Sequence, residues 1–130
     1  MLKKIAVDSQ DGVEFTDITS QVEEALQDSE VEAGIMNIFV PHASAAVTIM
    51  GTNGADIAKD IKFEINKLDD NFGHIEGRTS SAHFKSSLLG VDLTLNIDEG
   101  ELKLGENQGI YFSEFSGPAE REVLIKILEG

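Results

Sequence analysis

The chain has 130 residues, 41% of them hydrophobic, and a formal net charge of −14 from 24 acidic and 10 basic side chains. This length and composition predict one globular domain over residues 1–130 and exclude a disordered chain. The acidic balance disfavours nucleic acid and anionic membrane as partners, because both attract basic patches. No run approaches the roughly 18 consecutive apolar residues of a membrane span. The sequence contains no cysteine and the residues after Met1 do not resemble a signal peptide, so we expect a cytoplasmic protein without disulfides.

Two short strands and one capped helix are expected at the start of the chain. The strands are predicted over Leu2–Val7 and Gly12–Phe15, on either side of a polar turn. Thr19 and Ser20 offer hydroxyl oxygens for a helix N-terminus, and Ser20 and Glu23 have the spacing of a capping box. The apolar residues expected on one face of this helix are Val22, Ala25 and Leu26.

The middle of the chain predicts two strands, a helix and a long loop. Ile35–Val40 is an apolar run of strand length that Pro41 ends, and Ala45–Met50 is rich in β-branched residues. The clearest helix is expected over Asp56–Leu68, where isoleucines recur about once per turn. Asp69–Ser81 has no periodicity, and we interpret it as a loop of the length that often carries function.

The C-terminal part predicts a short turn or helix followed by antiparallel strands. The turn or helix is expected over Ala82–Leu89, and a half-buried strand after it, where leucine and isoleucine alternate. Asp98–Gly100 is typical of a hairpin turn, and Gly109–Phe115 and Glu122–Leu128 are two more strands. The predicted fold class is therefore α+β: a compact single domain with a mainly antiparallel β-sheet or sandwich and two main helices.

Three histidines are the candidate site residues that the sequence supplies. His42 follows the proline that ends a strand, and His74 and His83 stand at and just beyond the polar loop. Loops and strand ends on a rigid sheet are common places for sites, and three neutral imidazoles can hold a zinc ion with one position open. The spacing is not in itself a metal motif, so three independent surface or capping histidines remain the alternative.

Three stretches in the order of one known family make the interpretation more specific. They are Phe39–Ala46 (FVPHASAA), Ala82–Gly90 (AHFKSSLLG) and Leu104–Arg121 (LGENQGIYFSEFSGPAER). Together with His74 these stretches resemble the signature of the YjbQ-like family, and the similarity extends from about Asp17 to the C-terminus.

The resemblance implies a sheet-rich α+β fold, assembly as a homotrimer and a polar, metal-binding site around the three histidines. It also implies a secondary thiamine-phosphate synthase activity, a transferase reaction that joins a pyrimidine diphosphate to a thiazole phosphate. The expected partner is thus a small anionic substrate. The expected cofactor is a divalent metal, zinc in preference, or magnesium if the substrate carries a pyrophosphate.

The family pattern carries over residue by residue onto this chain. By resemblance, the catalytic and metal-binding residues are His42, His74 and His83, with Lys85 and Arg121 as further catalytic residues and Gln108 and Glu114 as cofactor-binding residues. Each has a structural alternative. Glu114 and Arg121 flank the Gly117–Pro118 turn and can pair with each other, Lys85 can be a solvated lysine, and Gln108 can cap a strand.

The sequence departs from the family pattern at two places. Acidic residues that relatives commonly carry after the second central strand are replaced by Met50–Gly54, and a common tryptophan is replaced by Asn107. A zinc-assisted hydrolase, with Glu76 or Glu114 moving protons, and a non-catalytic trimer that binds a ligand or metal are the alternative functions. A serine nucleophile is disfavoured because no G-x-S-x-G motif occurs.

Overall fold

The computed structural model describes residues 2–52, 57–68 and 77–130, with the backbone alone over 77–80. In this part of the chain, one sheet has the strand order β1-β8-β3-β5-β6 and a second has the order β2-β7-β4. Every strand pair is antiparallel. The strands are β1 (Leu2–Ser9), β2 (Glu14–Asp17), β3 (Gly34–Phe39), β4 (Ala45–Gly51), β5 (Asp92–Asp98), β6 (Glu101–Leu102), β7 (Gln108–Glu114) and β8 (Ala119–Glu129).

The two sheets pack face to face around the main hydrophobic core. Alternate residues of β3 and β8 point inward, such as Met36, Ile38 and Ile125, and all three have no exposed surface. They meet Ile110 and Phe112 of β7, which are equally buried. Because the side-chain period of a strand is two, this alternation sets which face of each sheet is inside. The predicted α+β sandwich is therefore confirmed.

Helix α1 (Thr19–Ser29) closes one side of this core with Val22, Ala25 and Leu26. These are the residues that the helical period predicts. The predicted capping box is wrong, since the helix N-terminus has no side-chain cap from Ser20. Asp17 accepts the Thr19 N–H at 3.0 Å instead, and the Thr19 hydroxyl accepts a hydrogen bond from the Ile110 N–H of β7. The chain thus fixes the helix to the sheet at its first residue.

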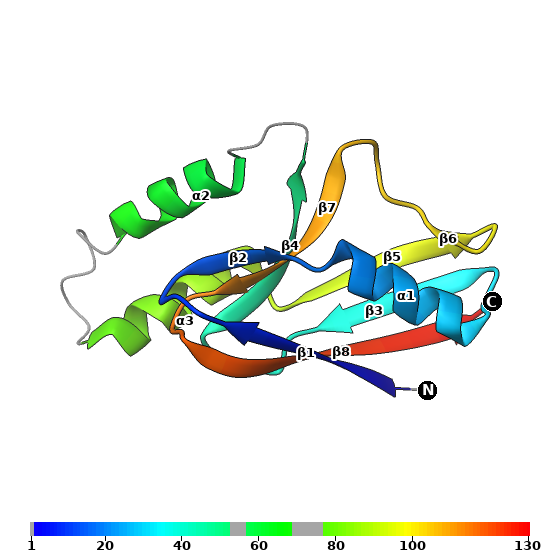
Figure 1. The fold of residues 1–130 in the computed structure, drawn as a ribbon, viewed down its shortest axis with the longest axis horizontal. Helices are drawn as coiled ribbons and strands as arrows, with labels where there is room; N and C mark the ends of the chain where they lie inside the picture. Colours follow the sequence, from blue (N-terminus) through cyan, green and yellow to red (C-terminus); the bar gives the residue numbers. More distant parts are fainter. Residues whose placement is uncertain (1, 53–56, 69–76) are drawn as a thin grey trace.

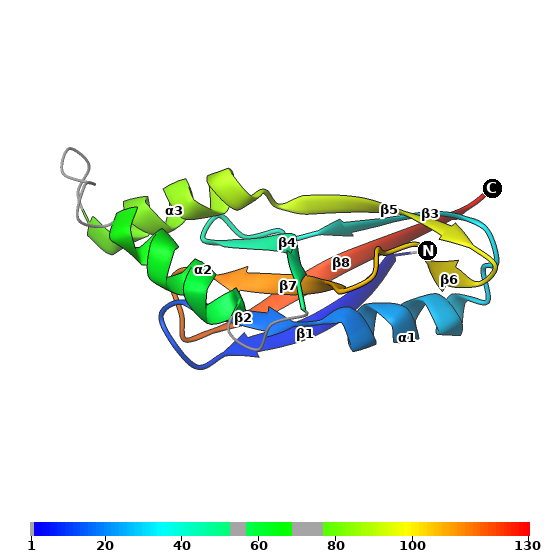
Figure 2. The ribbon, with the colours of Figure 1, turned by 90° about the horizontal axis from the view of Figure 1, so that it is seen from above.

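Helices α2 (Ile57–Asn66) and α3 (Gly77–Leu89) lie together at the other end of the molecule from α1 (Figures 1 and 2). They cover the second face of the smaller sheet, where Ile65 and Ala82 pack with Ala46 and Phe115. The predicted loop over Asp69–Ser81 is wrong at its end, because residues 77–81 are the first part of α3. The sequence shows no apolar helical period here because the buried face of this helix includes the polar residues Ser81, Lys85 and Ser86.

Neighbouring strands in the sequence are not always neighbours in space. β1 pairs with β8 and β2 with β7, so the turn after Ser9 carries the chain from one sheet to the other. The hairpin from β5 to β6 forms as predicted, with Glu99 and Gly100 both at positive φ. Two successive residues at positive φ give the turn whose twist matches that of the flanking strands.

Replacement of Asp17 by alanine tests the observed cap against the predicted one. We expect Asp17→Ala to lower the free energy of unfolding by about 1 kcal/mol, because the Thr19 N–H loses its acceptor. Ser20→Ala is the matched control and should stay within about 0.5 kcal/mol of the parent protein. Urea denaturation followed by circular dichroism measures both, and a larger loss for Ser20→Ala would refute the observed cap.

Candidate functional site

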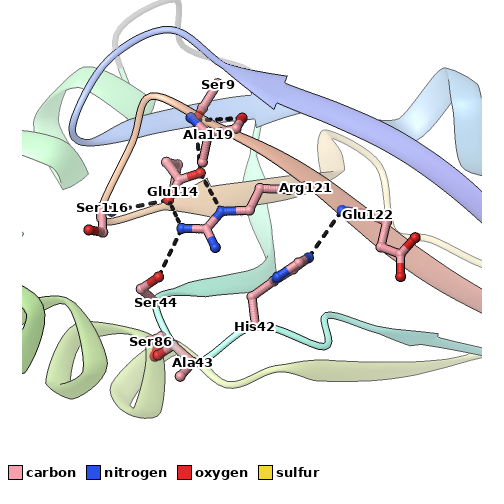
Figure 3. A network of polar contacts seen from close by, with 10 residues as sticks. All are labelled: Ser9, His42, Ala43, Ser44, Ser86, Glu114, Ser116, Ala119, Arg121 and Glu122. Atoms are coloured by element: carbon pink, nitrogen blue, oxygen red, sulfur yellow. Dashed lines mark hydrogen bonds and ion pairs between the residues drawn. The ribbon is translucent and has the colours of Figure 1, made fainter.

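A buried ion pair joins the ends of three strands at one end of the molecule (Figure 3). Glu114, at the end of β7, has no exposed surface, and its Oε2 lies 2.7 Å from Nη2 of Arg121 in β8. Its Oε1 accepts hydrogen bonds from Arg121 Nε at 2.9 Å and from the Ser9 hydroxyl at 2.8 Å. The Ser116 N–H donates to Oε2 at 3.1 Å. The predicted pairing of Glu114 with Arg121 is thus confirmed.

The partners of Glu114 keep its carboxyl ionised. Burial by itself raises the pKa of Glu114, but the hydrogen bonds from Arg121, Ser116 and Ser9 and the positive charge of Arg121 outweigh it, and the pKa lies below its ordinary value. The same hydrogen bond from Arg121 to Glu114 raises the pKa of Arg121, against the effect of its burial. Both groups therefore carry full charge, and Glu114 is a structural counter-ion with no exposed oxygen for a cofactor.

The pair also holds the segment that carries His42. Arg121 Nη2 donates to the Ser44 hydroxyl at 2.8 Å, and the Ser44 carbonyl accepts the Phe115 N–H at 3.1 Å. His42 Nε2 accepts the backbone N–H of Glu122 at 3.1 Å (Figure 3). A backbone N–H can only donate, so the neutral imidazole carries its proton on Nδ1. The ring of His42 is therefore oriented, with Nδ1 as its donor.

His83 lies on α3, on a segment that contacts the His42 segment. The Ser86 hydroxyl lies 2.6 Å from the carbonyl oxygen of Ala43 and 3.0 Å from that of His83. The side chain of His83 is exposed. Folding thus brings the backbones of two predicted site segments together. His74 lies outside the described residues.

His42 and Arg121 line one hollow of about 570 Å³ beside β1 and β8. The hollow is also lined by Lys4 and Asp8 of β1 and by Glu120 and Glu122 of β8. Asp8 lies directly opposite Glu120 in the strand register. The described lining therefore combines His42 and Arg121 with the acidic residues Asp8, Glu120 and Glu122, whose negative charge favours a bound group of positive charge.

The structure does not place Lys85 or Gln108 in this hollow. Lys85 is 2% exposed and lines a different cavity, between the helices and two turns. Gln108 begins β7 and its Oε1 accepts the Gly105 N–H at 2.6 Å, so it shapes a turn. Glu114 ends the same strand six residues later, which puts the two about 20 Å apart.

The described residues do not make a metal site on their own. Within residues 2–52, 57–68 and 77–130, no three His, Asp or Glu side chains are grouped closely enough to hold a metal ion. To bind a metal through Nε2, His42 would have to lose its hydrogen bond from the Glu122 N–H. The alternative is to bind the metal through Nδ1. The described residues thus do not by themselves supply a complete set of metal ligands.

Three further residues that the sequence did not predict contribute to these sites. Ser9 and Ser44 form hydrogen bonds with the Glu114–Arg121 ion pair, and Lys62 lines the other cavity together with Lys85. Ser44 lies two residues after His42 in the first signature stretch, and this proximity could have marked it as a site residue. Nothing local marks Ser9 or Lys62, because their roles depend on strands and helices that are distant in sequence.

With this fold and site, the chain belongs to the YjbQ-like (UPF0047) family. The family model described as "UPF0047 protein YjbQ-like" matches residues 3–130. A UPF0047 protein of Methanocaldococcus jannaschii is 40% identical over 131 residues, which cover 98% of this chain and 94% of the relative. The UPF0047 protein YugU of Bacillus subtilis is 36% identical over 135 residues, 98% of this chain and 99% of its own.

Solved structures of the family show the same fold. A YjbQ/UPF0047 protein from Clostridium acetobutylicum superposes with a TM-score of 0.91 at 36% identity, over 97% of this chain and 99% of that one. A YjbQ-like protein of unknown function from Sulfolobus solfataricus gives 0.90 at 29% identity, over 100% and 97%. In the described part of this chain, no helix is long and apolar enough to span a membrane.

The ion pair predicts a large stability loss in Glu114→Gln. The glutamine keeps the size of the side chain but removes the charge beside a largely buried guanidinium, so the free energy of unfolding at neutral pH should fall by about 3–5 kcal/mol. Glu23→Gln, on the exposed side of α1, is the control and should change it by less than about 0.5 kcal/mol. Urea denaturation measures both; equal, small effects would contradict the structure.

The lowered pKa of Glu114 also predicts a pH dependence. A carboxyl with a lower pKa in the folded protein stabilises fully above its unfolded pKa of about 4.3, and this stabilisation is lost as pH falls through the folded pKa. The parent protein should therefore lose more stability on acidification from about pH 5 to about pH 3 than Glu114→Gln does. Parallel pH profiles for the two proteins would contradict the assignment.

Proposed function

We propose that the protein is a transferase for small phosphorylated substrates, with its reaction centre in the hollow that His42 and Arg121 share. The narrower form of the proposal is a secondary thiamine-phosphate synthase activity, in which a pyrimidine diphosphate and a thiazole phosphate give thiamine phosphate and pyrophosphate. The observation that carries it is that His42, whose ring is oriented by the Glu122 N–H, and Arg121 line the same hollow.

The groups of the hollow support roles in such a reaction. Among the described residues, Glu114 and Ser44 engage Nε and Nη2 of Arg121, and Nη1 is left to meet a phosphate oxygen. Departure of pyrophosphate develops positive charge on the pyrimidine carbon, and the carboxylates of Asp8 and Glu120 can stabilise this charge. The Nδ1–H of His42 can donate to a substrate oxygen.

A divalent metal, zinc in preference, remains part of the proposal. What supports it is the contact between the His42 and His83 segments through Ser86. His74 and the carboxylates of a neighbouring subunit are the further donors that would complete a site. Magnesium is the alternative if the metal arrives with a pyrophosphate substrate.

Zinc-assisted hydrolysis and simple ligand binding are the competing functions. Hydrolysis needs an acid to move protons, and Glu114 is unsuited to this role because both its oxygens are buried and hydrogen-bonded. Glu76 lies outside the described residues. Retention of a ligand without turnover would favour the non-catalytic alternative.

The transferase proposal predicts activity that depends on His42. Purified protein given both substrates should form thiamine phosphate, detected by mass spectrometry, and His42→Ala should form it at least about 100-fold more slowly. Lys103→Ala, on the opposite edge of the larger sheet, is the control and should keep the parent rate. A parent protein no faster than His42→Ala would end the proposal.

The same preparations test the metal. Elemental analysis should find zinc in the parent protein and a loss of it in the double variant His42→Ala, His83→Ala. If activity survives chelation and no metal is present, the metal part fails while the transferase part stands.

A homotrimer is the assembly that we propose, and the outer face of the larger sheet supports it. Ile35 of β3 lies opposite Leu128 of β8 there, and the two are 40% and 52% exposed. Phe39 is 38% exposed on the same face. The face is also polarised, with Lys126 near one end and the Asp8–Glu120 pair near the other. A cyclic assembly can bring the basic end of one subunit against the acidic end of the next.

Light scattering at micromolar concentration should therefore give three times the mass of the chain. Phe39→Glu should dissociate the trimer, because it places a charge in the apolar centre of this face. Phe63→Glu, which alters an aromatic residue 65% exposed on α2, should leave the mass unchanged. A monomeric parent protein would contradict the assembly.

A further inference from the structure

A cavity of about 720 Å³ lies between α2, α3, the turn that joins β1 to β2 and the turn that joins β7 to β8. Both views place these four segments at the same end of the molecule (Figures 1 and 2). Within the described part of the chain, no residue that lines this cavity also lines the His42 hollow, although the Ser116 N–H on its wall donates to Glu114. The cavity is therefore a separate place from the proposed reaction centre.

Two lysines give this cavity a positive wall in an acidic protein. Among the described residues, Lys62 of α2 and Lys85 of α3 both line it, together with one aspartate, Asp11. The chain as a whole has 24 acidic and 10 basic side chains, so the balance among these described lining residues is the reverse of the general one. Lys85 is 2% exposed. The charge of a buried ammonium group acts on a neighbouring anion with little screening by water.

The rest of the lining suits an oxyanion with an organic part. Asn66 accepts a hydrogen bond from Lys85 through Oδ1 at 3.4 Å, so its amide nitrogen is a donor, and Ser81 adds a hydroxyl group. Phe115 forms an apolar part of the wall. Its ring is fixed edge-on against Phe15 with 6.0 Å between the ring centroids, which makes a rigid surface.

We propose that this cavity is a binding site for a small phosphate monoester. Lys62 and Lys85 contact the phosphate oxygens from two different helices, with Ser81 and Asn66 as neutral donors. The organic part of the ligand lies against Phe115. Lysine ammonium groups are standard phosphate ligands, and the apolar wall gives preference for an ester over free phosphate.

Titration of the full-length protein with phenyl phosphate, inorganic phosphate and benzyl alcohol tests the site by calorimetry. The parent protein should bind phenyl phosphate more tightly than inorganic phosphate and should not bind benzyl alcohol measurably. Lys62→Gln should weaken phenyl phosphate by at least about tenfold, since it removes one charge-assisted contact. Lys62 is only partly buried, so Lys62→Gln should fold. It is preferred to a substitution of the buried Lys85, which could also disturb folding.

Matched variants separate this site from general attraction and from the His42 hollow. Lys67 lies on the exposed surface just beyond α2, and Lys67→Gln should change the affinity for phenyl phosphate by less than about twofold. Lys62→Gln should weaken phenyl phosphate by the same factor in a His42→Ala background, because the two hollows are separate. Equal weakening by Lys62→Gln and Lys67→Gln, or no further weakening when Lys62→Gln is added to His42→Ala, would overturn the proposal. The absence of binding up to about 10 mM phenyl phosphate would do the same.

Discussion

The burial of one carboxylate is the constraint on which this end of the molecule depends. Glu114 has no contact with solvent, and a charge in that position is tolerated only when each oxygen is hydrogen-bonded and a counter-ion is adjacent. Its partners come from the end of β1, the β7–β8 turn and β8 itself. To keep the carboxylate satisfied, the ends of the two sheets must therefore stay in a single relative position.

This position determines where the chemistry-bearing residues lie. Arg121 reaches from Glu114 to Ser44, and it thus fixes the segment that carries His42 beside β8. On the other side, Ser116 extends from the same carboxylate to the wall of the lysine cavity. The ion pair is therefore the shared support of two hollows that differ in charge, one with an acidic rim and the other with a cationic wall.

Family membership explains the fold more fully than it explains the activity. The signature stretches that identify the family do not converge on one place in this chain. His42 and Arg121 line one hollow, Lys85 lines a separate cavity, and Gln108 shapes a turn at the far end of the strand that Glu114 ends. A motif that runs along a strand spreads its residues over the length of that strand, so a continuous signature can serve two ends of a sheet.

The sequence by itself determined the local structure. The apolar run Ile35–Val40 predicted β3, and the alternation of leucine and isoleucine predicted β5. The helical period predicted the buried face of α1, and the Glu114–Arg121 pair was one of two alternatives that the sequence left open. Only the structure showed that Asp17, and not Ser20, accepts the first N–H of α1 and that α3 begins at Gly77 with a polar buried face. It also decided that Lys62 and Lys85 share a cavity. The physical reason is that periodicity in the sequence indicates only which side of a helix or strand is buried. Contacts such as that of Ser9 with Glu114 depend on which distant strands pair with each other. That pairing is set by the packing of the whole chain.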